Sequence, residues 1–216
     1  MARVIAITGI DGSGKTSTAK SLRRSLADAG FSTRYQHQFD SIFARVLNAM
    51  RPARTTKPTK TPATKDGDPA SRHPRKASPL QRFTAYAFLL VQAIAANRAR
   101  LSRQDFLVFD RYVYDDFVRL RQRYAISERY FSIIEKLVPR PLLLVTLEGD
   151  ERVTYDRQVD IDTPFERYSE KLRIHTATMD KLRRLGLPCL AIDTTTNAPV
   201  EVLQMIMQTL GETGLR

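Results

Sequence analysis

The strongest constraint on the fold is the segment Gly9-Ile-Asp-Gly-Ser-Gly-Lys-Thr16, which fits the pattern G-x-x-x-x-G-K-[ST]. A short apolar run, Val4–Thr8, precedes it, and a segment with helical periodicity, Thr16–Ala29, follows it. A strand that leads through such a loop into a helix points several backbone N–H groups at one position. The start of the helix adds its partial positive charge there. The sequence therefore predicts a phosphate-binding loop at the carboxyl end of the first strand.

The fixed positions of this loop have separate physical roles. Gly12 and Gly14 allow the backbone to turn so that its N–H groups point inward. Lys15 is placed to reach the terminal phosphates of a nucleotide, and the Thr16 hydroxyl is placed to bind Mg²⁺. The alternative is a glycine-rich turn without a ligand, and the match along the whole motif argues against it. We expect the loop to bind ATP with Mg²⁺ through Gly9, Asp11, Gly12, Ser13, Gly14, Lys15, Thr16 and Ser17.

The rest of the chain alternates between short apolar runs and segments with helical periodicity. Such alternation predicts an α/β fold of three layers, in which a parallel sheet has helices on both faces. We expect strands over Val4–Thr8, Ser32–Gln38, Phe106–Phe109, Leu142–Leu147 and Leu190–Ile192. We expect helices over Thr16–Ala29, Ser41–Met50, Leu80–Leu101, Tyr112–Arg123, Glu128–Leu137, Phe165–Leu185 and Val200–Leu210.

The charge of the chain is unevenly distributed. The 216 residues include 35 Lys and Arg and 23 Asp and Glu, so the formal net charge is +12, which suggests a polyanion such as nucleic acid. Residues 51–79 carry half of this excess, six of the eleven prolines and no Val, Ile, Leu, Met, Phe or Tyr. We expect them to form a mobile basic insertion, since they have no apolar area to bury. It is either a solvated surface excursion or a lid-like or polyanion-binding segment.

Length and composition limit the class of protein. The length suits one domain over residues 1–216, and the single cysteine excludes a disulfide framework and a cysteine-built zinc site. No apolar run is long enough to span a membrane, and the first residues become polar too quickly for a signal peptide. The three histidines have no metal-ligand spacing and are interpreted as ordinary polar residues. We expect a cytoplasmic enzyme without a membrane partner.

A second candidate segment lies at the end of the third predicted strand. Asp110 follows the run Phe106–Phe109, and the carboxyl end of a parallel strand faces the ligand crevice of such a sheet. Asp110 can act on Mg²⁺ or position an acceptor, or it can cap the next helix. Arg111 can clamp an acceptor phosphate through two parallel hydrogen bonds, or it can be a solvated charge. The chain has no N-K-x-D element, which argues against a GTPase.

Together, the segments GIDGSGKT, Ala95-Ala-Asn-Arg98 and Asp110-Arg-Tyr112 resemble the thymidylate kinase family of P-loop nucleoside-monophosphate kinases. Their order and spacing match that family over most of the chain. The resemblance implies a five-stranded parallel sheet and transfer of the γ-phosphate of ATP to a nucleoside monophosphate. It implies dTMP as the first acceptor to test, Mg²⁺ as cofactor, and a homodimer formed through helices on one face of the sheet.

The resemblance also implies roles for individual side chains. It places Asp11 near the acceptor sugar, Arg98 near the acceptor base and Arg111 at the acceptor phosphate. Thr16 and Asp110 would hold the metal. The implied acceptor-binding set is Asp11, Ile94, Arg98, Arg111, Tyr112 and Asp115, and the implied catalytic set is Lys15, Asp110, Arg111 and Arg157.

A lid is the last part that the resemblance implies. It would cover residues 150–164 and close on ATP to exclude water. Arg157 would meet the ATP phosphates, with Arg152 as the alternative lid arginine. The same two arginines can also belong to a solvated helix face.

Departures from the family pattern leave the acceptor open. Ile94 stands where the family has an aromatic residue that stacks on the base, and Asp115 and Asp116 stand where it has small and aromatic residues. These two carboxylates are either acceptor contacts or exposed residues at a helix start. The resemblance therefore supports kinase chemistry more strongly than it supports thymidylate as the substrate, and another small acceptor is the first alternative.

Two further hypotheses assign the chain to other classes of protein. A nucleic-acid-binding P-loop ATPase is suggested by the basic segment, although the remaining net charge of +6 outside it is ordinary for an enzyme with two polyphosphate ligands. A P-loop protein that binds nucleotide without catalysis is disfavoured by the presence of Lys15, Thr16 and Asp110.

Overall fold

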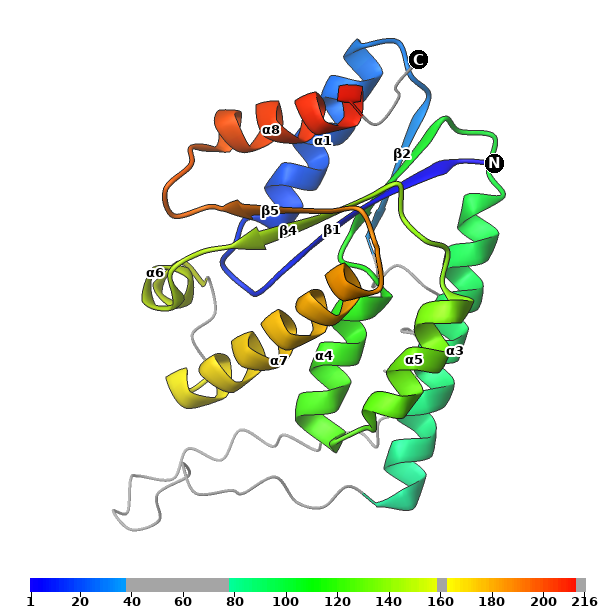
Figure 1. The fold of residues 1–216 in the computed structure, drawn as a ribbon, viewed down its shortest axis with the longest axis vertical. Helices are drawn as coiled ribbons and strands as arrows, with labels where there is room; N and C mark the ends of the chain where they lie inside the picture. The colour runs from blue at the N-terminus through cyan, green and yellow to red at the C-terminus, as the bar shows by residue number, and fades with distance from the viewer. Residues whose placement is uncertain (38–77, 159–162, 213–216) are drawn as a thin grey trace, which may run out of the picture.

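A computed structural model describes residues 1–37, 78–158 and 163–212, which form an α/β fold in three layers (Figure 1). Neighbouring strands of its central sheet are all parallel, in the order β2-β3-β1-β4-β5. The predicted fold class is confirmed. The strands are β1 (Arg3–Gly9), β2 (Thr33–His37), β3 (Phe106–Asp110), β4 (Leu143–Glu148) and β5 (Cys189–Asp193).

Helices cover both faces of this sheet. In Figure 1, α1 and α8 lie on one side of the strands, and α3, α4, α5 and α7 lie on the other. The helices are α1 (Lys15–Asp28), α3 (Pro79–Arg100), α4 (Val113–Tyr124), α5 (Glu128–Leu137), α6 (Glu151–Asp156), α7 (Phe165–Arg184) and α8 (Pro199–Glu212).

Successive side chains of each strand point to opposite faces of the sheet, so the core is divided into two clusters. In β1, Val4 and Ala6 pack with apolar residues of α3, α4, α5 and α7, whereas Ile5 and Ile7 pack with those of α1 and α8. A strand with helices on both faces buries every residue, so it reads as a continuous apolar run rather than an alternating one. This explains why the sequence showed these strands as short uninterrupted hydrophobic segments.

The topology brings the candidate segments to one edge of the sheet. Strand β1 lies between β3 and β4, with Ile7 opposite Asp110 and Gly9 opposite Leu147. The loop after β1, the start of α4 and the start of α6 therefore meet at the carboxyl ends of three adjacent strands. Ligands of open parallel sheets bind at this edge.

Two expectations about segment boundaries are corrected. Residues 151–156 form the helix α6, which the sequence reading had placed in a lid without assigning a helix. The predicted basic insertion also extends too far, because Ser78 caps α3 and Pro79 is its first residue. Ser78 Oγ accepts a hydrogen bond from the backbone N of Gln81 at 3.2 Å, and Gln81 Oε1 accepts one from the backbone N of Ser78 at 2.9 Å.

Some expectations fall on residues that the structure does not describe. The predicted helix Ser41–Met50 and residues 51–77 of the predicted insertion lie outside the described residues. Of the predicted lid, residues 159–162 lie outside them as well. Within the described ranges, no helix combines the length and the hydrophobicity that crossing a bilayer requires.

Candidate active site

The loop between β1 and α1 depends on two glycines in left-handed backbone conformations. Gly12 has φ of 84° and Gly14, the N-cap of α1, has φ of 80°. A Cβ at Gly12 would lie 2.0 Å from the carbonyl oxygen of Thr154, so the loop also touches α6 too closely for any side chain. At Gly14 no described atom lies within 4 Å of that position, so only the backbone conformation favours glycine there.

Lys15 lies inside this loop and is 4% exposed. Its Nζ donates a hydrogen bond to the backbone carbonyl of Ile10 and lies 4.0 Å from Asp11 Oδ1. Burial, together with the positive charge of Arg111, lowers the pKa of Lys15 to about 8, although Asp11 opposes the shift. The ammonium group therefore stays largely protonated at pH 7 and is directed into the loop that would hold phosphate.

Asp11 is the point where several cations converge. Arg111 Nη2 lies 2.7 Å from its Oδ1, and Lys171 Nζ lies 2.5 Å from its Oδ2. Burial alone would raise the pKa of Asp11, but the charges of Lys171, Arg111 and Lys15 hold it well below its usual range. Tyr168 fixes the backbone of the same residue, since its hydroxyl donates to the carbonyl oxygen of Asp11 at 3.0 Å.

Lys171 and Tyr168 were missed by the sequence reading. They lie three residues apart on α7, so they share a helix face, and that face meets the phosphate-binding loop. No motif marks them. The available signal was a lysine and a tyrosine spaced by three positions on a helix that follows the predicted lid.

Arg111 has an unusual backbone. Its φ is 69°, a conformation that costs a residue with a side chain about 1–2 kcal/mol, and its backbone N donates to the carbonyl oxygen of Ile7 at 3.0 Å. This turn directs the guanidinium to Asp11. Burial would lower the pKa of Arg111, but Asp11 and Asp115 outweigh it and raise the pKa. Backbone strain of this kind often occurs at functional sites.

Asp110 ends β3 and is fully buried. Its Oδ2 accepts a hydrogen bond from the Tyr35 hydroxyl at 2.7 Å and lies 3.6 Å from His37 Nε2. Within the described part of the chain, Asp110 Oδ1 has no hydrogen-bond partner. A buried carboxylate oxygen without a donor suits a hard cation, so Asp110 fits the predicted role at Mg²⁺. Thr16, with an exposed side chain at the start of α1, is the other predicted ligand.

Asp115 links three elements beneath the loop. Its Oδ1 accepts from the Thr8 hydroxyl at 2.8 Å, and its Oδ2 accepts from the backbone N of Tyr112 at 2.9 Å. His175 Nε2 lies 3.1 Å from the same Thr8 hydroxyl. Burial lowers the pKa of His175 to about 4, opposed by Asp115, so the ring is neutral at pH 7.

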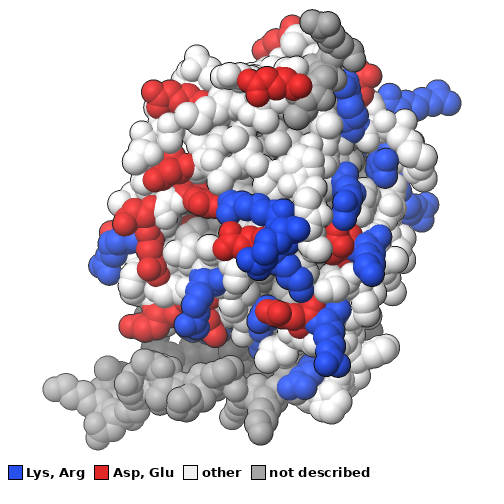
Figure 2. Space-filling view, viewed as in Figure 1, with Lys and Arg blue, Asp and Glu red and all other residues white. Residues whose placement is uncertain are grey.

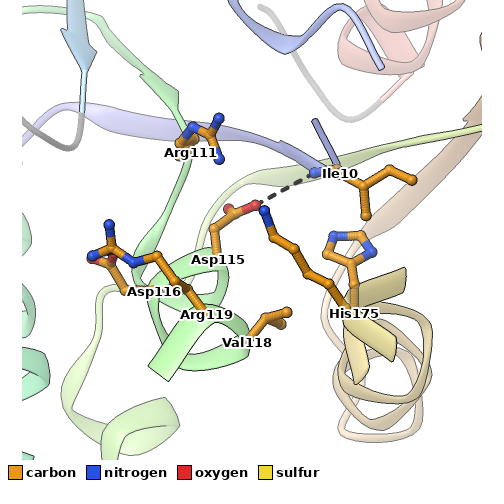
Figure 3. A pocket seen from close by; sticks show the side chains of 9 residues that line it. Ile10, Arg111, Asp115, Asp116, Val118, Arg119 and His175 are labelled. Carbon is orange, nitrogen blue, oxygen red and sulfur yellow. Dashed lines mark hydrogen bonds and ion pairs between the residues drawn. The ribbon is translucent and has the colours of Figure 1, made fainter. Parts of the chain in front are cut away.

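The reading of Asp115 and Asp116 as exposed carboxylates at a helix start is wrong, because both are buried. Asp116 Oδ1 accepts from Arg119 Nη2 at 2.8 Å, and its Oδ2 accepts from Gln92 Nε2 at 3.3 Å. Burial, opposed by the charge of Arg119 and reinforced by that of Asp115, raises the pKa of Asp116 to about 7. Figure 3 shows Asp116 and Arg119 side by side in the same pocket as Arg111, Asp115 and His175.

The predicted acceptor-binding residues are only partly brought together. Tyr112 is buried, lines a second pocket with Gln92 and Ala96, and donates its hydroxyl to the carbonyl oxygen of Pro139 at 2.6 Å. Ile94 is an exposed residue of α3 on the side away from this pocket, whereas Arg98 is exposed and lies one turn from Ala95, which lines the pocket. Their predicted contact with the acceptor stays a prediction.

A separate groove lies on the α1 and α8 side of the loop. It is lined by Gly12, Ser13, Gly14 and Ser17, by Arg157 and by the segment from Thr194 to Asn197. Arg157 Nη1 donates to the carbonyl oxygen of Thr194 at 3.0 Å. Arg152 does not line this groove and lies 3.6 Å from Asp156, so Arg157 is the better placed of the two predicted lid arginines.

No family model matches this sequence, and no curated protein matches it. Solved structures do match the fold. Deoxyadenosine kinase from M. mycoides, solved with dCMP and dCDP bound, is 12% identical, with a TM-score of 0.60 over 97% of this chain and 99% of that chain. The YorR protein from Bacillus subtilis, solved in complex with phosphorylated GDP, is 17% identical, with a TM-score of 0.55 over 96% of this chain and 95% of that chain. The chain shares its fold with these proteins.

Proposed function

We propose that this protein is a Mg-ATP-dependent kinase that transfers the γ-phosphate of ATP to a nucleoside monophosphate, with dTMP as the first acceptor to test. The observation that carries the proposal is the crevice at the carboxyl ends of β1 and β3. The phosphate-binding loop with Lys15 lies there beside Arg111 and Lys171, whose cations converge on Asp11. Two sets of phosphate-binding groups in one crevice suit a donor and an acceptor that both carry phosphate.

In such a reaction, some residues of this chain position the two substrates and others stabilise negative charge. Lys15 and the backbone of the loop hold the donor phosphates, and Arg157 lies in the groove beside them. Arg111 holds the acceptor phosphate, so that the two reacting groups are in line. The acceptor oxygen is already anionic near pH 7, so no side chain has to remove a proton. Positive charge then stabilises the transition state.

Mg²⁺ would be held by Thr16 and Asp110. It would neutralise negative charge on the phosphates of ATP. Among the described residues, no group of three or more His, Cys, Asp or Glu side chains could hold a metal ion by itself. This suits Mg²⁺, which usually takes one or two protein ligands and completes its shell with substrate phosphates and water.

A neutral nucleoside is the second candidate acceptor. Deoxyadenosine kinase, whose fold this chain shares, is by its name a kinase of a nucleoside. The buried pair of Gln92 and Asp116 is also able to form hydrogen bonds with a base edge. Under this alternative, the acceptor hydroxyl must lose a proton, and Asp110, buried at the carboxyl end of β3, is a candidate base.

A nucleic-acid-dependent ATPase is the alternative from another class. On the face seen in Figure 2, Lys and Arg gather towards the centre and right and Asp and Glu towards the left, with acidic side chains among the central basic ones. Among the described residues several cations are paired, as Arg183 is with Glu148 and Asp180. Such pairing lowers the positive charge that a nucleic acid would meet, so it favours the kinase.

One coupled assay of ADP release separates these candidates. The acceptors are dTMP and the other nucleoside monophosphates, the parent nucleosides, single-stranded DNA and no acceptor. ADP formed only with a monophosphate supports the proposal, and ADP formed with a nucleoside supports the second candidate. Stimulation by DNA with steep salt dependence supports the third. ADP formation that is independent of every acceptor would refute all three.

We also propose that the protein forms a homodimer through α3. Leu80, Phe83, Leu90, Ile94 and Leu101 are exposed, and their spacings of three, seven, four and seven residues place them on one face along this helix. Ile133 and Leu137 of the neighbouring helix α5 are exposed as well, and a standard interface buries ~800 Å² of each partner. Leu90→Glu should convert the dimer to a monomer in light scattering, whereas the exposed polar substitution Arg129→Glu should not. A wild-type protein that is monomeric at micromolar concentration would contradict the dimer.

A further inference from the structure

The side chain of Asp11 is held as a bound anion would be held. Arg111 and Lys171 approach different oxygens of its carboxylate, at 2.7 and 2.5 Å, and Lys15 lies 4.0 Å away. Two cations on two oxygens of one group is the arrangement of a bidentate anion site. Arg111 and Lys171 also line the pocket shown in Figure 3, together with Gly9 and Ile10 at the start of the loop.

The backbone of Asp11 does not depend on these ion pairs. Tyr168 holds its carbonyl oxygen, and His175 contacts Thr8, so α7 is fixed to this region by two further hydrogen bonds. The carboxylate itself is 35% exposed. These ion pairs are partly buried, because the side chains of Arg111 and Lys171 are 25% and 20% exposed, so the two cations remain compensated only if another anion replaces the carboxylate. A stronger anion is then able to take its place.

We propose that Asp11 occupies, before substrate binds, the position of the acceptor's phosphate, and that Lys171 together with Arg111 binds that phosphate when it displaces the carboxylate. This inference rests on the proposed function, because it requires an acceptor that carries phosphate. Lys171 is thereby a phosphate-binding residue that no motif marks. A phosphate dianion has more charge and more acceptor oxygens than a carboxylate, so it competes effectively for both cations.

The competing explanation is that Lys171 only fastens α7 to the loop. In that case its removal would loosen the loop and weaken the binding of ATP or ADP as much as that of the acceptor. The two explanations differ in which ligand is affected. They also differ in the effect of Asp11→Asn, because removal of a competing anion should strengthen phosphate binding.

The test uses the full-length protein with MgADP at saturation, which fills the phosphate-binding loop. Inorganic phosphate is then titrated and its affinity measured by calorimetry. We expect Lys171→Met to weaken phosphate binding by about 10- to 100-fold with the affinity for ADP unchanged. Lys171→Arg should restore most of the affinity, and Asp11→Asn should increase it. Arg173→Met is the matched control, since Arg173 is an exposed cation two positions along the same helix.

Three results would overturn the inference. The first is a Lys171→Met variant that binds phosphate like the wild type, and the second is equal loss of ADP and phosphate binding. The third is weaker phosphate binding in Asp11→Asn, a variant that decides the question even if Lys171→Met does not fold. Failure of the proposed function gives a different result, because the wild type would then bind no ADP or release none with any acceptor.

Discussion

Gly12 offers a sharp test of how closely the phosphate-binding loop packs on α6. The substitution Gly12→Ala adds one methyl group at a residue with φ of 84°, and that methyl would lie 2.0 Å from the carbonyl oxygen of Thr154. Gly30→Ala is the matched control. Gly30 has nearly the same backbone conformation, φ of 89°, but no described atom lies within 4 Å of its new Cβ.

The two variants separate backbone strain from collision. In both, the left-handed conformation costs a residue with a side chain about 1–2 kcal/mol. Only in Gly12→Ala must α6 or the loop also move, and overpacking of this kind costs about 1–3 kcal/mol more. For a chain of this size 1 kcal/mol lowers the melting temperature by about 2–4 °C. We therefore expect a fall of about 2–8 °C for Gly30→Ala and a clearly larger fall for Gly12→Ala.

The assay combines thermal unfolding with ATP affinity. Gly30→Ala should bind ATP normally, because Gly30 follows the far end of α1. Gly12→Ala should lose ATP binding, since the displaced loop no longer presents its N–H groups together. If both variants melt at the same temperature and bind ATP equally well, the contact between the loop and α6 is not part of the protein in solution.

Three further predictions concern single side chains. Lys15→Ala should abolish ATP turnover while circular dichroism and melting temperature remain near those of the wild type; full activity would remove Lys15 from the mechanism. Arg157→Met should raise the KM for ATP by about tenfold or more, because a charged hydrogen bond is lost, whereas Arg152→Met should have little effect; the reverse order would make Arg152 the lid arginine. Burial lowers the pKa of His175 to about 4, from 6.5 in the unfolded chain. Below pH 6.5 the unfolded chain therefore binds a proton that the folded protein does not bind, and the free energy of unfolding falls as the pH falls. Between pH 7.5 and pH 5 this loss amounts to about 2 kcal/mol, so urea unfolding of His175→Gln should vary less with pH than that of the wild type; an identical pH dependence would contradict the burial argument.

The fold was predictable because its signals are local. A glycine-rich loop between an apolar run and a helix determines β1 and α1, and the continuous apolar runs identify strands covered on both faces. The short helix α6 was missed because six residues, Glu151–Asp156, hold too little periodicity. Ser78 was assigned to the insertion by composition, although Ser78 and Gln81 have the S-x-x-Q spacing of a capping box.

The site was less predictable because its geometry is non-local. Asp11 and Lys171 are 160 positions apart, and nothing in the sequence pairs them. The same limit applies to Asp115, whose two possible environments could not be separated until α4 was placed against β1. The acceptor contacts that a motif match suggested for Ile94 and Arg98 stay predictions, and both residues are exposed on α3.

The hydrogen bonds of Asp115 affect how experiments on this crevice are interpreted. One carboxylate caps α4 through Tyr112, holds Thr8 at the end of β1, and through Thr8 reaches His175 of α7. An alanine at this position would release all three segments together, so lost activity would not identify an acceptor contact. Asn is a more conservative replacement than Ala: it removes the charge and keeps one accepting oxygen, but its NH2 group takes the place of the other, so it cannot accept from both Thr8 and Tyr112.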